Sequence, residues 1–397
     1  MSSDHEHVTE LTLKYGINPG QRTASVIHKG EKLPFEVLSG RPSYINILDA
    51  LRGWRLVREL RERFGRPAAA SFKHVNPAGV GLSGQVSPAF LHTHFLEDIA
   101  VSPVAEAYLR ARQADRVSSY GDFVILSDMV DAPAAALLAK VVSDGVIAPG
   151  YCAEALSKLR TKRDGRYLIL EIDPTYRPED REFRTEFGIT LTQDADVTNV
   201  RDPLEANIVS KLNEISSTAR DDLLLATIVA KHTQSNAVVL ASGGQTIGIG
   251  AGQQSRISAT EIACQKADRY RLLFHPALQC LSFTASLSRV EKMNLVDSLV
   301  RFEELDSRRR QSALANLQCR FVPLSPDQRQ AWLSADGPIC LASDGFIPFR
   351  DNVDRAAQSG VTHIVQPGGS VRDEPVTEAA DDHGIVMLHT GQRYFLH

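Results

Sequence analysis

The chain has 397 residues, and its 43% hydrophobic and 23% charged residues are an ordinary balance for a soluble globular protein. The formal net charge of −4 argues against nucleic-acid binding as its main function. The five cysteines are scattered, without a Cys-x-x-Cys, and the longest strongly apolar run, Leu223–Ala230, is too short to span a bilayer. We therefore expect a cytoplasmic protein without a metal site, and with neither nucleic acid nor a membrane among its partners.

Local signals predict the N-terminal elements. Residues 1–10 are polar and acidic, lack the apolar segment of a signal peptide, and are expected to form a short disordered tail. Apolar residues at helical spacing predict a helix over 47–64, which Gly65 and Pro67 end. Small apolar residues predict a buried strand over 67–72, and the Asn-Pro and glycines of 76–81 predict a bend directly after it.

The same rhythm of helix and strand returns later in the chain. Asp221 and Asp222 are expected to favour a helix N-terminus, and the helix continues to Lys231. Further strands are predicted over 237–241, 361–365 and 385–388, and further helices over 352–359 and 373–383. This alternation predicts a layered α/β architecture, and the repetition hints at two related subdomains joined by the polar stretch 173–205.

Lys73 and His74 stand side by side where the first predicted strand opens into a turn. A cation beside a group that titrates near neutrality suggests acid–base chemistry at such a place. The alternative is a solvated lysine next to a histidine bonded to backbone, and the pair alone favours that alternative.

The spacing of Gly248, Gly250 and Gly252 is similar to the glycine motif of dinucleotide-binding proteins, but the residues around it do not match that motif. Ser255 stands at the third fingerprint position, and the next suitable acid, Asp268, falls in a helical pattern. We expect a glycine turn that lets backbone approach a ligand. The sequence contains neither a P-loop nor the zinc-deaminase signature.

Five segments, in fixed order, resemble one family. They are Leu13–Pro19, Ser71–Gly81, Lys231–Asn236, Gly248–Arg256 and Ser343–Ala356. Together they resemble the transformylase domain of the bifunctional purine-biosynthesis family, which formylates 5-aminoimidazole-4-carboxamide ribonucleotide (AICAR), and the resemblance runs from about Leu11 to His397. It implies two cytidine-deaminase-like α/β subdomains in one transformylase unit, which we divide at 11–200 and 201–397. It also implies a homodimer with sites at the subunit interface and, in some members, a nearby potassium ion.

The resemblance implies a reaction and roles for residues. The formyl group of 10-formyltetrahydrofolate passes to the 5-amino group of AICAR, giving formyl-AICAR and tetrahydrofolate in de novo purine biosynthesis. His74 is the candidate base, Lys73 the electrostatic stabiliser and Asn236 an oxyanion donor, while Asp351 orients the folate or moves a proton. The implied AICAR contacts are Lys14, Tyr15, Asn46, Ser118, Gly121, Asp144, Arg256 and Arg393, and the implied folate contacts are Phe346, Pro348, Phe349 and Asn352.

Two departures from the family pattern keep alternatives open. Lys14 and Gly20 stand where members usually carry arginine and histidine, and a lysine meets a phosphate without the bidentate fork of arginine. We also expect a stand-alone transformylase, because the cyclohydrolase domain that usually precedes this region is not seen. One alternative is a folate-dependent formyltransferase for a related amino-nucleotide. Another, a non-catalytic AICAR-binding regulator, is disfavoured because the four candidate catalytic residues are all present.

Overall fold

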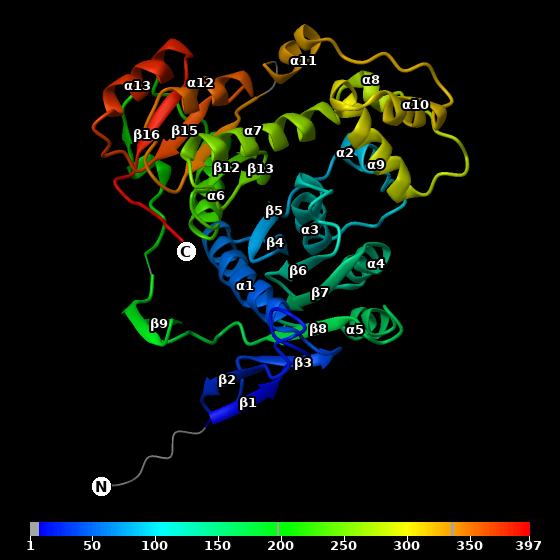
Figure 1. Ribbon diagram of the computed structural model, residues 1–397, viewed down its shortest axis with the longest axis vertical. Coiled ribbons are helices and arrows are strands. Elements are labelled where there is room, and N and C mark those ends of the chain that lie inside the picture. Colours follow the sequence, from blue (N-terminus) through cyan, green and yellow to red (C-terminus); the bar gives the residue numbers. More distant parts are fainter. Residues whose placement is uncertain (1–7, 197, 335–336) are drawn as a thin grey trace.

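The computed structural model describes residues 8–196, 198–334 and 337–397 (Figure 1). The first half of the chain contains β3 (Phe35–Ser39), α1 (Tyr44–Phe64), β4 (Ala68–Lys73), β5 (Asn76–Leu82), α2 (Pro88–Thr93), α3 (Pro103–Ala114), β6 (Asp122–Leu126), α4 (Ala132–Lys140), β7 (Ser143–Ala148), α5 (Ala153–Arg160) and β8 (Leu168–Ile172). Two antiparallel hairpins stand apart from the main sheet, β1 (Val8–Thr12) with β2 (Ser25–Lys29) and β9 (Arg181–Glu186) with β10 (Ile189–Asp194).

The second half contains β11 (Asn207–Ile208), α6 (Ser217–Lys231), β12 (Val238–Ser242), β13 (Gln245–Gly250), α7 (Arg256–Leu272), β14 (Cys340–Ser343), α12 (Asp351–Gln358), β15 (His363–Gln366), α13 (Asp373–Asp382) and β16 (Val386–His389). Between α7 and β14 it inserts α8 (Pro276–Gln279), α9 (Arg289–Val300), α10 (Ser307–Ala315) and α11 (Pro326–Leu333). In Figure 1, α8, α9 and α10 are grouped together, and a long loop leads from them to α11.

One mixed, 12-stranded sheet joins the two halves in the order β11-β16-β15-β14-β12-β13-β5-β4-β6-β7-β8-β3. The two halves meet at the β5–β13 contact in the centre of the sheet. From there the strands run β5-β4-β6-β7-β8-β3 in the first half and β13-β12-β14-β15-β16-β11 in the second. Corresponding neighbours in the two halves pair in the same sense, parallel or antiparallel. The predicted α/β class is confirmed. The predicted division between residues 200 and 201 falls between β10 and β11, and it stays a prediction.

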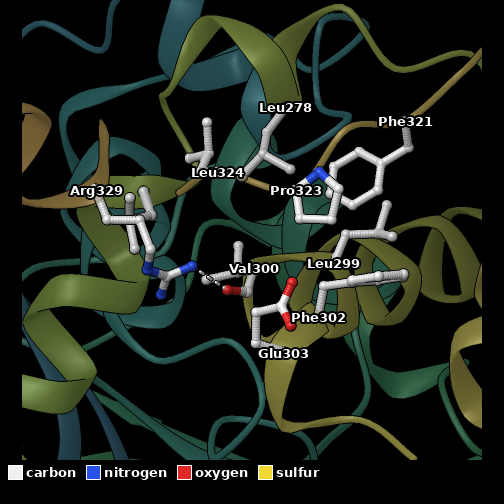
Figure 2. Close-up of a pocket in the computed structure, with 10 residues that line it drawn as sticks. Leu278, Leu299, Val300, Phe302, Glu303, Phe321, Pro323, Leu324 and Arg329 are labelled. Atoms are coloured by element: carbon white, nitrogen blue, oxygen red, sulfur yellow. Dashed lines mark hydrogen bonds between the residues drawn. The ribbon is translucent and has the colours of Figure 1, made fainter. Parts of the chain in front are cut away.

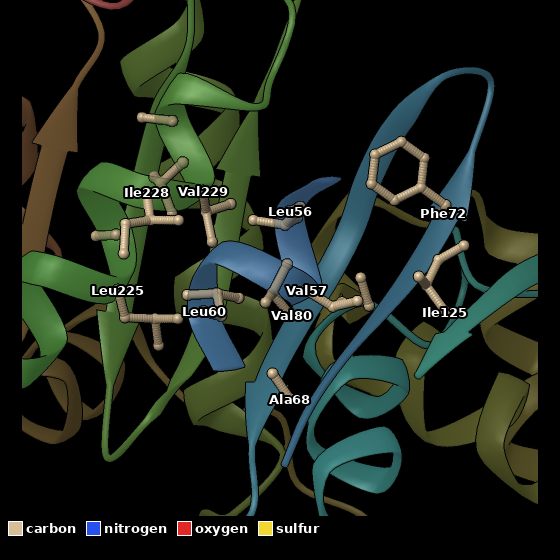
Figure 3. Packing of buried hydrophobic residues seen from close by; sticks show 14 of the residues in the cluster. Leu56, Val57, Leu60, Ala68, Phe72, Val80, Ile125, Leu225, Ile228 and Val229 are labelled. Carbon is tan, nitrogen blue, oxygen red and sulfur yellow. The ribbon is translucent and has the colours of Figure 1, made fainter. Parts of the chain in front are cut away.

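Helices cover both faces of the sheet, so the central strands are buried on both sides. On one face α1 and α6 pack against each other and against the strands, with Leu56 and Leu60 meeting Leu225 and Val229 in one shared cluster (Figure 3). On the other face the two halves have separate clusters, under α3 and α4 in the first half and under α7, α12 and α13 in the second. The shared cluster therefore crosses from one half to the other.

Glycines allow one helix of each half to lie directly on a strand. A Cβ at Gly79 in β5 would lie 2.1 Å from the carbonyl oxygen of Ala111 in α3, and one at Gly248 in β13 would lie 2.0 Å from that of Ala263 in α7. Gly248 and Gly250 are thus strand residues that admit a helix, and the predicted ligand-approach turn is wrong for them. Gly252, with φ of 65°, does lie in the turn that follows β13.

Three other local predictions change. The predicted bend at 76–81 is wrong, because Asn76–Leu82 is β5 and the chain turns earlier, at His74 and Val75. Residues 8–10 of the predicted tail belong to β1, while residues 1–7 lie outside the described residues. Asp222 does not mark a helix start, because α6 begins at Ser217 and Asp222 is its buried sixth residue. The helix predicted over 47–64 is confirmed as α1, which ends at a left-handed Gly65.

Candidate active site

The turn between β4 and β5 carries two of the candidate catalytic residues. β4 ends at Lys73, and His74 and Val75 form the turn with φ of 52° and 65°. A two-residue hairpin turn with positive φ at both positions matches the twist of its strands. Non-glycine residues adopt this conformation at a steric cost, which is greatest for a β-branched residue such as Val75. The strained turn leaves the side chain of His74 exposed.

The loop that follows α3 fixes the Lys73 ammonium. Lys73 Nζ donates to the carbonyl oxygen of Tyr120 at 2.7 Å. Asp115 holds this loop, because its carboxylate accepts the Ser118 backbone N–H at 3.0 Å and the Ser118 hydroxyl at 2.6 Å, and it pairs with Lys266 at 3.0 Å. Burial opposes ionisation of Asp115, but the Lys266 ammonium and the Ser118 hydrogen bonds outweigh it and lower the pKa.

These side chains open onto a cavity of about 450 Å³ that both halves of the chain line. The first half contributes Lys73, His74, Asn76, Pro77, Ala78 and Ser118, and the second half contributes Ile249, Ala251, Gln253, Ile262 and Lys266. Among these described lining residues two are lysines and none carries a carboxylate. Because Asp115 offsets the charge of Lys266, the positive charge that favours an anionic ligand comes from Lys73. The cavity has the size of a small-molecule site.

A second polar cluster lies where β12 begins and β14 ends. Arg256, the buried first residue of α7, pairs with the buried carboxylate of Asp344 and donates to the carbonyl oxygen of Ala237 at 3.1 Å. Its other terminal nitrogen donates to Asn236 Oδ1 at 2.7 Å. Asn236 Nδ2 donates in turn to the carbonyl oxygen of Gln253, a cavity residue, at 2.8 Å. Arg256 thus orients Asn236 beside the cavity through contacts within the protein.

The C-terminal segment is tied to this second cluster. The backbone N–H of Ser235 donates to the carbonyl oxygen of Leu396 at 3.0 Å, and the Leu396 N–H donates to Ser235 Oγ at 3.1 Å. The side chain of Tyr394 is buried at 4% exposure. Arg393 is exposed and its guanidinium carbon lies 4.6 Å from the centroid of the Phe395 ring. The last residues therefore form an ordered edge that presents Arg393 outward.

The segment between β14 and α12 presents the aromatic rings expected to contact the folate. Phe346 and Phe349 are 47% and 52% exposed, which is unusual for large apolar side chains in a folded chain. Pro348 between them is half-buried, and the guanidinium of Arg372 lies 5.2 Å from the Phe349 ring centroid. These rings are accessible to a flat ligand.

The two polar residues that follow differ in their access to a ligand. Asp351 is exposed in the first turn of α12. Asn352 is buried, accepts the Thr260 hydroxyl at 2.8 Å, and donates to Asp351 Oδ1 at 2.8 Å. Asn352 therefore ties α12 to α7, while Asp351 remains accessible to solvent.

The start of α1 gathers three of the residues expected to contact AICAR. Lys14 is exposed, with Nζ 5.5 Å from the Tyr15 ring centroid, and the Tyr15 carbonyl accepts the Tyr44 N–H at 3.2 Å. Asn46 Oδ1 accepts the Ser43 N–H at 3.0 Å in a capping box that begins the helix. Lys14 is thus a cation held beside the helix N-terminus, where an anion is favoured.

The remaining two expected AICAR contacts lie at the amino ends of neighbouring parallel strands. Gly121, directly before β6, has φ of 77° and open space where a side chain would stand. Asp144 in β7 is exposed and pairs with Arg163 at 3.1 Å. Gly121 and Asp144 therefore lie at the amino ends of their strands, whereas Lys73 stands at the carboxyl end of β4 and Asp344 and Asp351 follow the carboxyl end of β14.

The structure brings some of the predicted residues together and leaves others apart. Lys73, His74 and Ser118 line one cavity, and Asn236 adjoins it through Gln253. Within the described residues no hydrogen bond or ion pair joins Arg393 to this cavity. Sequence reasoning missed Asp115, Lys266 and Gln253, because their roles depend on partners far away in the chain. It also missed the buried acid Asp49, which stands on the apolar face of α1.

Two other cavities are less suited to the expected substrates. One, of about 10 Å³, lies among apolar side chains of the inserted helices, next to Arg329 and Val300 (Figure 2). It has the volume of a single water molecule. Another, of about 720 Å³, lies between α1 and the 176–182 segment, and its lining carries charges of both signs. One of its carboxylates, Glu59, pairs with Lys231 and His232.

Two searches of the described residues give negative findings. No group of three or more His, Cys, Asp or Glu side chains in that part of the chain is placed to hold a metal ion. Among the helices described, none combines the length and apolar character that crossing a membrane requires.

Known proteins resemble this chain over nearly its whole length. A family model described as "AICARFT/IMPCHase bienzyme" matches residues 2–266. The chain is also similar to the bifunctional purine biosynthesis protein PurH from Cereibacter sphaeroides strains ATCC 17029, ATCC 17025 and ATCC 17023, at 32% identity over 390 residues in each case. Each match covers 97% of this chain but 59% of the relative, so the chain spans about three-fifths of the length of these curated relatives.

Proposed function

This chain belongs to the AICARFT/IMPCHase bienzyme family, and on that basis we propose that it transfers the formyl group of 10-formyltetrahydrofolate to the 5-amino group of AICAR. The relatives are named for purine biosynthesis, and the proposed reaction is a step of that synthesis. Family membership supports the coarser part of the proposal, a transferase of purine biosynthesis. The donor, the acceptor and a cytoplasmic location are parts of the proposal.

One observation of the structure carries the proposal. The turn after β4 presents an ammonium and an imidazole to a cavity of about 450 Å³ whose described lining includes a second lysine and no carboxylate. A nucleotide monophosphate is an anion that such a cavity attracts. The imidazole of a histidine is a common general base, and here it is placed to remove a proton from an amine bound in the cavity.

The chemistry assigns a task to each group. The amine of AICAR is a weak nucleophile, because its lone pair is drawn into the ring and the carboxamide. Its nitrogen bonds to the formyl carbon, the bond from that carbon to N10 of the folate breaks, and N10 gains a proton. His74 takes the proton that the amine loses, while Lys73 stabilises the tetrahedral oxyanion and supplies the proton to N10. Asn236, oriented by Arg256, donates a further hydrogen bond to the oxyanion.

The outlying residues bind the two substrates in this proposal. Arg393 and Lys14 meet the nucleotide phosphate, and the exposed rings of Phe346 and Phe349 stack on the folate, which Asp351 orients. We place the family's homodimer in the proposal too, because a second copy can bring Arg393 to the cavity of the first. The potassium ion of some family members is part of the proposal as well. Next to Asn236, the Ser235 hydroxyl donates to Asp344 Oδ2 and the Leu396 carbonyl accepts the Ser235 N–H, so hydroxyl, carboxylate and carbonyl oxygens are available near the site.

The test is an absorbance assay of the purified protein with AICAR and 10-formyltetrahydrofolate. Formation of tetrahydrofolate that depends on AICAR is expected. Substituting a panel of other amino-imidazole and amino-sugar nucleotides tests the acceptor, and their preferred use would replace AICAR in the proposal. AICAR binding without any turnover would instead identify a regulator.

A further inference from the structure

A buried carboxylate supports the strained turn from behind. Asp49 lies on α1, is 5% exposed, and accepts the backbone N–H of Val75 at 2.6 Å through Oδ1. The sequence carries an acid here among the apolar residues Ile47, Ala50 and Trp54, all of which are buried. A buried acid persists where it makes a specific bond. For Asp49 that bond is to the turn that carries His74.

The second half of the chain contains the same arrangement. Asp222 is the sixth residue of α6, as Asp49 is the sixth of α1. Its carboxylate accepts the N–H groups of Gly243 at 2.8 Å and Gly244 at 2.7 Å, in the turn between β12 and β13. Because β12–β13 holds the same place in the sheet order as β4–β5, the two aspartates occupy equivalent positions.

The two turns share a backbone shape but differ in how easily they adopt it. Gly243 and Gly244 have φ of 62° and 80°, which glycine adopts without steric cost. His74 and Val75 adopt φ of 52° and 65° although both carry a Cβ. Such a conformation persists only where the surroundings hold it. The His74–Val75 turn therefore depends on its supporting carboxylate more than the glycine turn does.

We propose that Asp49 is a positioning residue of the candidate active site, whose carboxylate holds the His74–Val75 turn in the left-handed conformation that presents Lys73 and His74 to the cavity. Its catalytic consequence rests on the proposed function. Its structural consequence, the protection of the turn, is independent of any reaction. Asp49 lies behind the turn, where it contacts the Val75 backbone, and it is not among the residues that line the cavity.

The first test measures amide hydrogen exchange in the turn. Asp49→Ala is expected to speed exchange of the Val75 N–H by at least about tenfold, because the bond that protects it is gone. Asp49→Asn keeps an oxygen at the same place and should retain most of the protection. Asp222→Ala is the matched control, and it should speed exchange at Gly243 and Gly244 while leaving Val75 unchanged. Unchanged exchange at Val75 in Asp49→Ala would overturn the proposal.

The second test measures steady-state kinetics beside thermal melting. Asp49→Ala should lower kcat roughly ten- to a hundredfold, since small displacements of reacting groups have effects of that size, while the AICAR KM moves much less. Asp222→Ala should lose similar thermal stability and keep its kcat. Adding Val75→Gly to Asp49→Ala should recover kcat to within several-fold, because glycine adopts the turn unaided. A double variant as slow as Asp49→Ala would show that Asp49 does not act through the turn.

The two proposals fail in different ways. If the unaltered protein transfers no formyl group, the proposed function fails, and the exchange measurement still decides whether Asp49 holds the turn. If transfer is normal in Asp49→Ala despite faster exchange, the proposed function stands and the positioning role falls. If Asp49→Ala does not fold, the proposal rests on Asp49→Asn, which must then keep both slow exchange at Val75 and most of kcat.

Discussion

Asn76 Oδ1 accepts the backbone N–H of Gln234 at 2.9 Å, and this bond joins the His74–Val75 turn of the first half to the loop of the second half that carries Asn236. Asn76 Nδ2 also donates to the carbonyl oxygen of His74 at 3.2 Å. Asn76 therefore links the candidate base to the candidate oxyanion donor. The candidate chemistry depends on this junction between two halves of one sheet.

Replacing His74 with Ala should lower kcat by roughly 10²–10⁴, because loss of a general base acts on the chemical step. AICAR affinity, measured by calorimetry, should change little. His92→Ala is a suitable control, since that exposed histidine bonds Glu97 away from the cavity. A His74→Ala variant with near-normal turnover would remove this side chain from the mechanism.

Replacing Lys73 with Arg should also abolish most activity although it keeps the charge. Lys73 Nζ meets the Tyr120 carbonyl at 2.7 Å, a contact suited to a compact ammonium, and a planar guanidinium is larger and directs its donors differently. The measurement is kcat at saturating substrates, with melting temperature as the check on folding. Full activity would mean that any cation serves here.

Replacing Arg393 with Ala should raise the AICAR KM strongly and leave thermal stability unchanged, because the side chain is exposed and its proposed partner is a phosphate. Deleting residues 393–397 is a poorer test than it seems from the sequence, because the deletion also removes the buried Tyr394. That variant should lose stability as well as activity. An unchanged KM in Arg393→Ala would place the phosphate elsewhere.

Mixing two impaired variants, assayed at an AICAR concentration well below the KM of Arg393→Ala, tests whether the site is shared between subunits. If Arg393 of one copy serves the cavity of the other, a mixture of His74→Ala and Arg393→Ala should regain activity, because one of the two sites in each mixed dimer is intact. Random pairing predicts about a quarter of the unaltered rate. Sedimentation of each protein establishes the oligomer first, and a mixture of dimers without recovered activity would assign both residues to one subunit.

The pH dependence of stability should reveal the two buried aspartates. Burial raises the pKa of Asp49 from 3.8 to about 6, against the Val75 N–H and Arg52, which lower it, while Asp144 adds to the rise. Burial raises the pKa of Asp222 to about 6 as well, against the Gly244 and Gly243 N–H groups and Arg110, while Asp221 adds to the rise. Between about pH 4 and 6 the folded protein thus holds protons that the unfolded chain has released, so each group's contribution to stability falls as the pH rises.

Asp49→Asn and Asp222→Asn remove this titration. The free energy of unfolding of each variant, relative to the unaltered protein, should therefore rise between pH 4.5 and 7, by at most about 3 kcal/mol. Urea unfolding at the two pH values measures the change. A difference that is the same at both values would show that the carboxyl group does not titrate in this window.

Local sequence patterns were sufficient to predict elements that are determined by neighbouring residues in the chain. The apolar spacing from Ile47 to Phe64 and the glycine after it predicted α1 to within a few residues. Gly79 and Gly248 misled prediction, because each is a strand residue whose missing side chain makes room for a helix. Such a reason comes from packing between distant segments, and no local pattern carries it.

Some features of the candidate site could also be predicted from the sequence, and others could not. The adjacency of Lys73 and His74 was visible in the sequence, and the structure places both at one cavity. Asp49 and Asp222 were each visible as an acid within an apolar helical stretch, a signal that could have been used. Their bonds to two hairpin turns could not be predicted, because they depend on which strands follow each helix and on how tightly the helix lies on them.

The junction between the halves is weak in backbone pairing and strong in side-chain packing. β5 and β13 share one register pair, Gln245 with Gly81, whereas the shared cluster under α1 and α6 runs across both halves (Figure 3). Because the cluster belongs to both, neither half can melt without exposing apolar surface of the other. The two repeats should therefore behave as one cooperative unit, with a single unfolding transition. A destabilising mutation in either repeat, even far from the cavity, should lower the stability of the other through that common core.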